Sequence, residues 1–440
     1  MRWLKSFLLA LLVTATLAAQ GGIRQLTILH TNDLHAHFSP SGDGLGGFAY
    51  LAAAIRKETA HCAACLTLNA GDLVQGTPVS TIYRGLPVYQ VANLLGFDAG
   101  TVGNHEFDYG WRQIGKFVAL ARYPIVSANL LDAAGRPATG KAYVIKNVGG
   151  VRVAIIGAIL SDLVGNFATP EAVGELRVAP LLPAIRRAVD DIGNRADLIV
   201  VLGHLHNSET EQILKEVPQV SVIVAGHEHE GYGDMKRVGA RVAVQLRAYG
   251  VELGRLDLQV DLPHRSVVAA NWKRIPIDTH QIAPAPDVAR VVLSWEAKVS
   301  RIVDIPIGTA THRMAEQEVR SLVERAMAEE TGADFAWVNL GNIRDFLPAG
   351  RLLARNVWNV LPFDNHIVTG RFKGSRLPPA MTAEHPVDPN QEYTVATTDF
   401  TAANQASSDQ LSTTGLEFPK IGPLQRDAVI DWIRKKQVVP

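Results

Sequence analysis

The sequence predicts two domains: a layered α/β domain, in which sheets are flanked by helices, followed by a smaller α+β domain. The chain has 440 residues, which is more than one compact domain usually contains. Short β-branched runs alternate with helical patterns from about Leu26 to Asp261, as they do in layered α/β domains. Around residues 275–290 this alternation stops at a proline-rich stretch, which divides the chain in two.

The first domain is predicted from its strands and helices in order. The segments with the composition of strands are Leu26–Thr31, Leu66–Asn69, Ala99–Val102, Ile125–Ala128, Val151–Ile159, Leu198–Leu202, Val220–Ala225, Val242–Leu246 and Arg255–Val260. Helical patterns lie between several of them, at Phe48–Lys57, Trp111–Ala121, Leu182–Gly193 and Ser208–Lys215. Strands that alternate with helices in this way favour sheets covered by helices.

The second domain begins after the connector Ile282-Ala-Pro284-Ala-Pro286. Asp287 is expected to cap a helix that runs to about Val303. A further helix is expected at Glu316–Glu330, followed by strands and turns to the end of the sequence. The expected domains are therefore a first domain at 24–275, a linker and connecting helix at 276–304, and a second domain at 305–440.

Residues 1–19 have the parts of a secretory signal peptide. Arg2 and Lys5 precede an apolar run from Phe7 to Leu17, and small residues follow. The run is shorter than the about 20 residues that span a bilayer, although an uncleaved anchor is the alternative. We expect an exported protein, periplasmic or secreted, that has no stable membrane insertion once the signal is cleaved.

The charge balance bears on whether the protein binds nucleic acid, and the cysteine spacing bears on whether it contains a disulfide. The 43 basic and 43 acidic residues give a formal net charge of zero, which argues against binding of nucleic acid. The chain has 2 cysteines, Cys62 and Cys65, spaced C-x-x-C. In an exported protein this spacing predicts a local disulfide or plain thiols, with redox catalysis as the alternative.

Five short polar motifs each follow a predicted strand directly. They are Asp33-Leu-His35, Gly71-Asp72, Gly103-Asn104-His105-Glu106, Gly203-His204 and Gly226-His227-Glu228-His229. In layered α/β domains ligands collect at the carboxyl ends of strands, so these residues should converge at one edge. Any one motif alone is common in turns and caps, but chance does not explain all of them in order at strand ends.

The side chains in these motifs are typical of a dinuclear metal hydrolase. Carboxylate oxygens and imidazole nitrogens suit zinc, manganese or iron. Period-two spacing on an extended chain would point Asp33 and His35 in the same direction. Asp72 could give one oxygen to each of two divalent metal ions, and two metals roughly 3.5–4 Å apart can clamp a phosphate and activate water.

The set of motifs resembles the calcineurin-like metallophosphoesterases. Within that group, Leu29-His-Thr-Asn-Asp-Leu-His35 and Gly103-Asn-His-Glu-Phe-Asp-Tyr-Gly110 are similar to the 5′-nucleotidase branch. The resemblance covers nearly all of the chain after the signal segment, strongly in the first domain and in patches in the second. It implies an exported enzyme with a catalytic metal domain followed by a substrate-binding domain.

The resemblance also implies a role for each motif residue. One metal would be held by Asp33, His35 and His229, the other by Asn104, His204 and His227, and Asp72 would bridge the two. His105 would face the phosphate instead of a metal, and Asp108 would orient it. A carboxylate that orients an imidazole also favours its charged form.

The second domain follows the family pattern less completely. The family's Asn-Gly-Gly-Gly-Ile-Arg is here Asn339-Leu-Gly-Asn-Ile-Arg344, and Leu361-Pro362-Phe363 is present. Thr398-Asp399-Phe400 matches the later aromatic motif, but the glycine run that follows it in the family is absent. The resemblance implies that Phe363 and Phe400 stack a nucleobase while Asn339 and Arg344 contact the nucleotide. The alternative is that both phenylalanines fill the core.

The sequence therefore predicts an exported dinuclear-metal phosphoesterase that hydrolyses nucleoside 5′-monophosphates or related nucleotides to nucleoside and phosphate. One alternative is the same metal chemistry on another ester: a cyclic nucleotide, a nucleotide sugar or a thiosulfate–protein conjugate. Another is a non-catalytic metal- or nucleotide-binding protein. The His105 and Asp108 pair argues against that last alternative, because a protein that only binds has no need of it.

Overall fold

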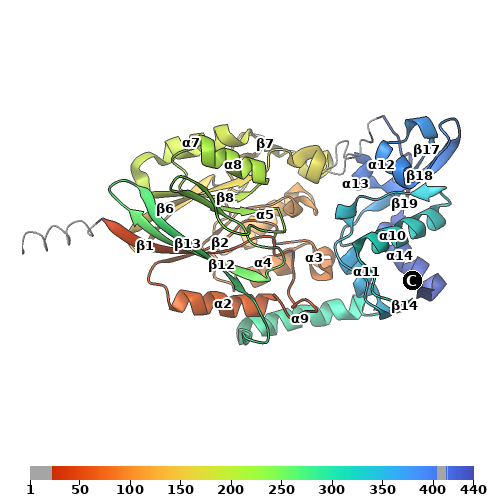
Figure 1. Ribbon diagram of the computed structural model, residues 1–440, viewed down its shortest axis with the longest axis horizontal. Coiled ribbons are helices and arrows are strands. Elements are labelled where there is room, and N and C mark those ends of the chain that lie inside the picture. The colour runs from red at the N-terminus through yellow and green to blue at the C-terminus, as the bar shows by residue number, and fades with distance from the viewer. Residues whose placement is uncertain (1–21, 404–412, 414) are drawn as a thin grey trace, which may run out of the picture.

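The computed structural model describes residues 22–403, 413 and 415–440. The predicted signal segment at 1–19 lies outside the described residues. Figure 1 shows a larger body, coloured red to green, beside a smaller one in cyan and blue. Helix α9 (Pro286–Val303) runs under the larger body toward the smaller one. Across the described residues, no helix has both the length and the apolar character needed to cross a membrane.

The larger domain contains two sheets. The first has the order β13-β12-β1-β2-β3. Its strands are β1 (Ile23–Thr31), β2 (Cys65–Asn69), β3 (Ala99–Gly100), β12 (Glu252–Asp261) and β13 (Ser266–Pro276). Strands β1, β2 and β3 run parallel, so their carboxyl ends lie at the same edge.

The second sheet has the order β10-β11-β9-β8-β6-β5. Its strands are β5 (Tyr143–Val148), β6 (Val151–Ile159), β8 (Leu198–His204), β9 (Val222–Gly226), β10 (Lys236–Val238) and β11 (Arg241–Val244). Strands β6, β8, β9 and β11 are parallel. The short strands β4 (Leu130–Leu131) and β7 (Arg177–Val178) form a separate pair.

Both faces of the second sheet are buried, which is why its strands are apolar runs instead of alternating ones. In β8, Val200 and Leu202 pack with Ile28 and Leu68 in the core between the two sheets. Val201 points the other way and packs with residues of the outer helices. Side chains alternate between the faces of a strand, so this run supplies two cores at once.

Helices cover the outer faces of both sheets, giving a helix–sheet–sheet–helix sandwich (Figure 1). The second sheet carries α7 (Leu181–Ile192) and α8 (Asn207–Glu216). The first sheet is covered by α2 (Phe48–Ala60), against which α9 packs, and by α4 (Leu86–Ala92) and α5 (Trp111–Leu120).

The smaller domain has a core of its own, which includes Ile307, Val323, Leu352 and Ile433. Its sheets have the orders β15-β18-β17-β19 and β16-β14-β20. The strands are β14 (Pro306–Ala310), β15 (Phe335–Ala336), β16 (Gly350–Leu353), β17 (His366–Lys373), β18 (Glu392–Thr398), β19 (Lys420–Leu424) and β20 (Val438–Val439). The helices are α10 (Glu316–Thr331), α11 (Ala354–Val360), α12 (Pro379–Glu384), α13 (Asp399–Ala403) and α14 (Gln425–Lys436).

The structure confirms the predicted layered α/β domain and the smaller α+β domain, and it corrects three local expectations. The chain after Glu330 does not consist of strands and turns alone: it also forms α11, α12, α13 and α14, and the apolar face of α14 packs in the core of the smaller domain. The segment Ile125–Ala128 is not a strand, since Ile125 makes only an isolated bridge to Gly100. Asp287 does not cap α9: Ala285 occupies the cap position, and the Asp287 carboxylate binds Arg56 at 2.7 and 2.8 Å. That ion pair holds α9 against α2.

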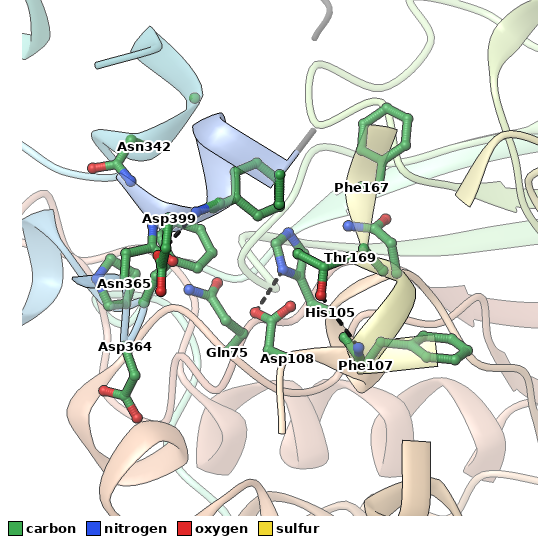
Figure 2. Close-up of a pocket in the computed structure, with 18 of the residues that line it drawn as sticks. Gln75, His105, Phe107, Asp108, Phe167, Thr169, Asn342, Asp364, Asn365 and Asp399 are labelled. Atoms are coloured by element: carbon green, nitrogen blue, oxygen red, sulfur yellow. Dashed lines mark hydrogen bonds and ion pairs between the residues drawn. The ribbon is translucent and has the colours of Figure 1, made fainter. Parts of the chain in front are cut away.

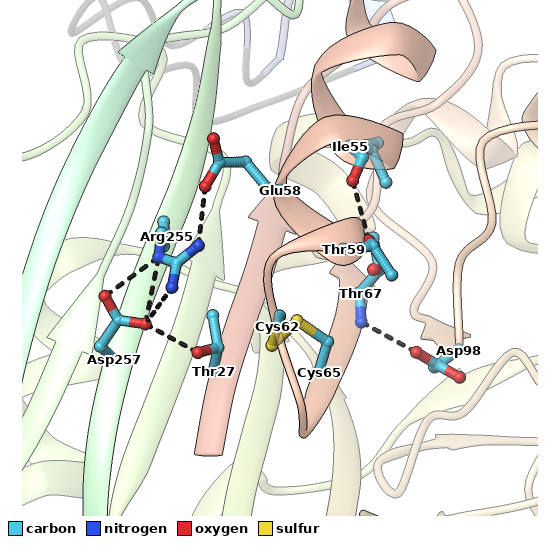
Figure 3. The surroundings of a disulfide bond; sticks show 10 residues. All are labelled: Thr27, Ile55, Glu58, Thr59, Cys62, Cys65, Thr67, Asp98, Arg255 and Asp257. Atoms are coloured by element: carbon cyan, nitrogen blue, oxygen red, sulfur yellow. Dashed lines mark hydrogen bonds and ion pairs between the residues drawn. A yellow bond between two sulfur atoms is a disulfide. The ribbon is translucent and has the colours of Figure 1, made fainter. Parts of the chain in front are cut away.

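Cys62 and Cys65 form a disulfide, the first of the two alternatives for this pair (Figure 3). The bond ties the end of α2 to the start of β2. Close by, Arg255 of β12 bridges Glu58 at 2.7 Å and Asp257 at 3.0 Å. The disulfide therefore fixes the start of β2, the end opposite Asp72, while Arg255 links β12 to α2.

Candidate dinuclear metal site

The polar motifs meet at the carboxyl edge shared by the two sheets. Asp33 follows β1, Asp72 follows β2 and Asn104 follows β3, while His204 ends β8 and His227 follows β9. The backbone N–H of Asp33 donates to the Gly71 carbonyl at 3.1 Å, and that of His35 donates to the Asp72 carbonyl at 3.0 Å. The first two turns are thus bonded to each other.

Several residues at this edge have a left-handed backbone. The φ angles are 50° at Asp33, 45° at His35, 49° at Asp72 and 93° at His227. The expectation that Asp33 and His35 lie on an extended chain is therefore wrong, because the chain turns sharply between them. Their side chains still converge, through the turn. Strained backbone of this kind persists only where surrounding contacts fix it, and it clusters at functional sites.

One set of donor atoms gathers around His35. Ligand atoms of Asp33, His35, Asp72 and His229 all lie within 4.8 Å of one another. His35 Nε2 is 3.0 Å from His229 Nε2 and 3.7 Å from Asp72 Oδ2. His229 Nε2 is 3.9 Å from Asp33 Oδ1. Nitrogens and oxygens that converge so closely are arranged like the ligands of one cation.

A second set gathers around Asn104. Its side-chain oxygen lies 3.0 Å from His204 Nε2 and 3.1 Å from His227 Nδ1. Asp72 Oδ2 is 3.2 Å from the same His204 nitrogen. Asp72 therefore lies between the two sets, where a bridging carboxylate would be.

Hydrogen bonds outside this cluster orient its donor atoms. His204 Nδ1 donates to the Ala70 carbonyl at 2.9 Å, and since a carbonyl only accepts, Nε2 is left free to bind a metal. Glu106 is fully buried and accepts from the N–H groups of Asp72, Leu73 and Gly103 at 3.2, 3.0 and 2.6 Å. Its carboxylate ties the turn after β2 to the turn after β3.

Burial and neighbouring charges shift the pKa values of the side chains in the cluster. Burial lowers the pKa of His227 to about 3 and that of His35 well below its usual value, so both rings are neutral, the form that binds metals. Burial would lower the pKa of His204 as well, but Asp72 beside it raises the value to about 9. Burial raises the pKa of Asp33 to about 6. Carboxylate, imidazole and amide donors together suit zinc, manganese or iron.

His105 and Asp108 form a pair at the edge of this cluster. His105 Nδ1 donates to Asp108 Oδ2 at 2.9 Å, which leaves Nε2 free, 4.0 Å from Asp72 Oδ2. The backbone N–H of His105 donates to Asp72 Oδ1 at 3.0 Å. Burial acts to lower the pKa of His105, but Asp108 and Asp72 outweigh it, so the pKa is raised. The pair favours a protonated imidazole beside the cluster.

A cavity of about 500 Å³ lies between the two domains (Figure 2). Its lining includes His105, Asp108, Asn339, Arg344, Phe363 and Phe400. The Phe363 ring centroid is 5.8 Å from that of His105, and the Arg344 guanidinium carbon is 5.9 Å from the Phe363 ring. All the residues singled out for substrate in the second domain therefore open into the cavity that His105 lines.

The two phenylalanines are only half-buried, and neither belongs to the described hydrophobic cores of the smaller domain. Phe363 follows α11, and its loop is held to the larger domain because Thr81 Oγ1 donates to the Pro362 carbonyl at 2.8 Å. Phe400 lies in α13. Their exposure to the cavity argues against a purely structural role.

The sequence analysis gave no role to several residues that line the cavity or support the site, and four of them stand out. Glu106 stands inside a recognised motif, yet its side chain was given no role. Asn342 occupies a position where the family shows glycine, and this departure is a signal that could have found it. Gln75 and Phe167 also line the cavity, and no local pattern marks them.

The chain is similar to known proteins over both domains. Residues 26–231 match the family described as calcineurin-like phosphoesterase, and residues 298–385 match the 5′-nucleotidase C-terminal domain. Endonuclease YhcR of Bacillus subtilis is 26% identical over 82% of this chain, but the match spans only 33% of YhcR. UshA of Escherichia coli is 25% identical over 87% of this chain and 81% of its own length.

A solved structure has the same arrangement. The 5′-nucleotidase precursor from Thermus thermophilus aligns with 95% of this chain and 97% of its own, with a TM-score of 0.85 and 23% identity. The likeness shows that the fold, including both domains, is shared.

Proposed function

The chain belongs to the 5′-nucleotidase family of the calcineurin-like metallophosphoesterases, which are hydrolases, and we propose that it hydrolyses nucleoside 5′-monophosphates or related nucleotides. Hydrolysis breaks the bond between phosphorus and the 5′ oxygen. Water supplies the hydroxyl on phosphorus and the proton on the leaving oxygen. The products are nucleoside and phosphate.

The position of Asp72 is the observation that carries the proposal. Its Oδ2 lies 3.7 Å from His35 Nε2 and 3.2 Å from His204 Nε2, between two converging sets of donors. The proposed metal ligands are Asp33, His35 and His229 for one ion, Asn104, His204 and His227 for the other, and Asp72 for both. When bound, two divalent ions supply charge stabilisation for the phosphoryl oxygens and a lowered pKa for water.

The residues of the chain then have separate tasks. His105 keeps its Nδ1 proton in the bond to Asp108, so Nε2 is the atom that can donate to a phosphoryl oxygen. The raised pKa of His105 favours the protonated ring that this task needs. Arg344 adds a second positive group on the side of the smaller domain.

Two aromatic rings are proposed to bind the base of the substrate. Phe363 and Phe400 would stack the base, with Asn339 and Arg344 contacting the nucleotide, and such stacking tolerates different bases.

We also propose that the enzyme acts outside the cytoplasm. Two features support this: the signal-like composition of residues 1–19, and the Cys62–Cys65 disulfide, since disulfides persist in oxidising compartments.

A panel of phosphate esters, assayed with zinc, manganese and iron, tests the proposal. We expect the highest kcat/KM for nucleoside 5′-monophosphates. Faster turnover of a cyclic nucleotide, a nucleotide sugar or a thiosulfate–protein conjugate would keep the metal chemistry and replace the substrate. Bound metal without hydrolysis of any ester would indicate a binding protein and contradict the proposal.

A further inference from the structure

Gln75 lies three residues beyond Asp72, on the loop that leads from β2 into α3 (Pro78–Tyr83). Its backbone is left-handed, with φ 69°, and its N–H donates to Ser80 Oγ at 2.8 Å. The next residue must be glycine, because a Cβ on Gly76 would come within 2.7 Å of the His35 carbonyl oxygen. The backbone of the loop is therefore held in one conformation at Gln75 and Gly76.

The amide of Gln75 is buried without a partner. The residue is 1% exposed, and within the described part of the chain neither Nε2 nor Oε1 has a hydrogen-bond partner. A buried amide with no partner lowers the free energy of unfolding, so each one in a native protein needs an explanation. Gln113 of α5 is the contrast: it is 3% exposed, and its Nε2 donates to the Arg84 carbonyl at 2.7 Å.

The Gln75 amide lies inside the cavity between the two domains. In Figure 2 it stands between the His105–Asp108 pair on one side and Asp399 with Asn365 on the other. The carboxylates on both sides already have partners. Asp108 binds His105, and Asp399 accepts from the backbone N–H groups of His366 and Phe400. A ligand that enters the cavity can supply the partner that the amide lacks.

The chemistry of the free amide selects the kind of ligand group. An amide presents one donor group and one acceptor, and both are free here. Phosphoryl oxygens only accept, so they could engage Nε2 and would leave Oε1 unpaired. A sugar hydroxyl both donates and accepts, so it can satisfy both ends of the amide. In a nucleotide the sugar also lies between the phosphate, proposed at His105, and the base, proposed at Phe363 and Phe400.

We propose that Gln75 binds the hydroxyl groups of the substrate's sugar and selects for esters whose leaving group carries them. This inference rests on the proposed nucleotide hydrolysis and adds a specificity residue from the catalytic domain. Its loop is the one that presents Asp72, so the residue fixes the sugar relative to the metal cluster.

The test compares Gln75→Met with Gln113→Met, two substitutions that remove a buried amide and keep its volume. The substrates are adenosine 5′-monophosphate and its 2′,3′-dideoxy analogue. We expect the wild type to prefer the ribonucleotide, and Gln75→Met to reduce that ratio of kcat/KM by about tenfold, the size of one net hydrogen bond. Gln113→Met should keep the wild-type ratio. An unchanged ratio in Gln75→Met would overturn the assignment.

Stability gives a second readout that needs no substrate. Gln75→Met should melt at or above the wild-type temperature, because it removes an unpartnered amide, whereas Gln113→Met should melt lower, because it leaves the Arg84 carbonyl without its donor. If Gln75→Met melts as far below the wild type as Gln113→Met, the amide has a structural role and the proposal is wrong.

A failure of nucleotide hydrolysis itself would look different. A wild type that cleaves p-nitrophenyl phosphate but no nucleotide would contradict the proposed function. Gln75 is then tested with ribose 5-phosphate against p-nitrophenyl phosphate, which carries no sugar. We expect Gln75→Met to lower kcat/KM for the first ester alone. Equal losses on both esters would show that Gln75 does not bind the sugar.

Discussion

At the level of single residues, Asp72 is the side chain on which the proposed site depends most, because both of its oxygens have a role. Its Oδ1 accepts from the His105 N–H at 3.0 Å, while its Oδ2 lies between the two sets of metal donors. Its own backbone N–H is held by Glu106. The bond from the His105 N–H to Oδ1 therefore orients the buried carboxylate, and Oδ2 remains free to bind the proposed metals.

Asp72→Asn tests this arrangement. Asp72 Oδ2 alone faces both donor sets, since Oδ1 accepts from the His105 N–H, and an amide oxygen in its place carries no negative charge to hold two cations together. Loss of a residue that only supports a metal ligand typically costs about 10–100-fold, so loss of the bridging ligand should lower kcat by more than about 100-fold. Metal analysis should find fewer than two equivalents bound. A variant with wild-type metal content and wild-type rate would show that Asp72 does not bridge two metals.

His105→Asn should separate catalysis from metal binding. The ring donates to Asp108 through Nδ1, and we assign its free Nε2 to the phosphate, not to a metal. A positioned proton donor contributes about 10²–10⁴-fold, so kcat should fall by that factor while two equivalents of metal remain bound. Loss of one equivalent in this variant would show that His105 is a ligand.

At the scale of elements, the turns at the ends of the strands build the site. The turn after β3 packs directly on Asp72, because a Cβ on Gly103 would come within 2.1 Å of Asp72 Oδ1 and 2.8 Å of the Asp72 backbone nitrogen. The Glu106 carboxylate bonds both turns. The two turns therefore behave as one unit, and a change in one should displace the proposed metal ligand on the other.

Gly103→Ala tests that coupling, and Gly115→Ala in α5 is its matched control. An added Cβ at Gly115 meets nothing within 4 Å, and alanine favours a helix by about 1 kcal/mol over glycine, so that variant should be slightly more stable and fully active. Gly103→Ala should lose metal affinity and activity. Melting curves and metal titrations of both variants measure the difference. Equal activity in the two would mean that the turns are independent.

Sequence reasoning located these elements better than it described their turns. The strands before the site are buried apolar runs, so their ends could be predicted, and β6 has the predicted bounds. The left-handed backbone at Asp33, His35 and Asp72 could not be predicted, because tertiary contacts impose it. Strand β13 was missed: it is largely exposed, and Asn271, Lys273 and Arg274 interrupt its apolar residues.

At the scale of the whole molecule, the cavity depends on both domains. Arg355 of α11 binds Asp304 at 2.6 Å and Glu296 of α9 at 3.0 Å, and Thr81 bonds the loop that carries Phe363. These contacts bring the Phe363 ring beside His105. Contacts between residues so far apart in the sequence leave no local sequence pattern. The cavity, and the position of Gln75 within it, could therefore be found only in the structure.

Phe363→Leu and Phe400→Leu test the proposed clamp. If the rings hold the base equally in the ground and transition states, each change should raise KM for a nucleotide and spare p-nitrophenyl phosphate, which has no base. Phe372→Leu is the control: Phe372 is buried in the smaller domain, so its loss should lower the melting temperature and leave KM unchanged. Equal losses on both substrates in the clamp variants would end the nucleotide assignment.

We propose that two metal ions, held by turns at the ends of strands of both sheets, catalyse the reaction. The direct measurement removes all metal with a chelator, adds zinc or manganese back in counted equivalents, and follows hydrolysis of a phosphate ester. Activity should be absent without metal and should reach its maximum when two equivalents per chain are bound. Full activity at one equivalent, or after complete chelation, would contradict it.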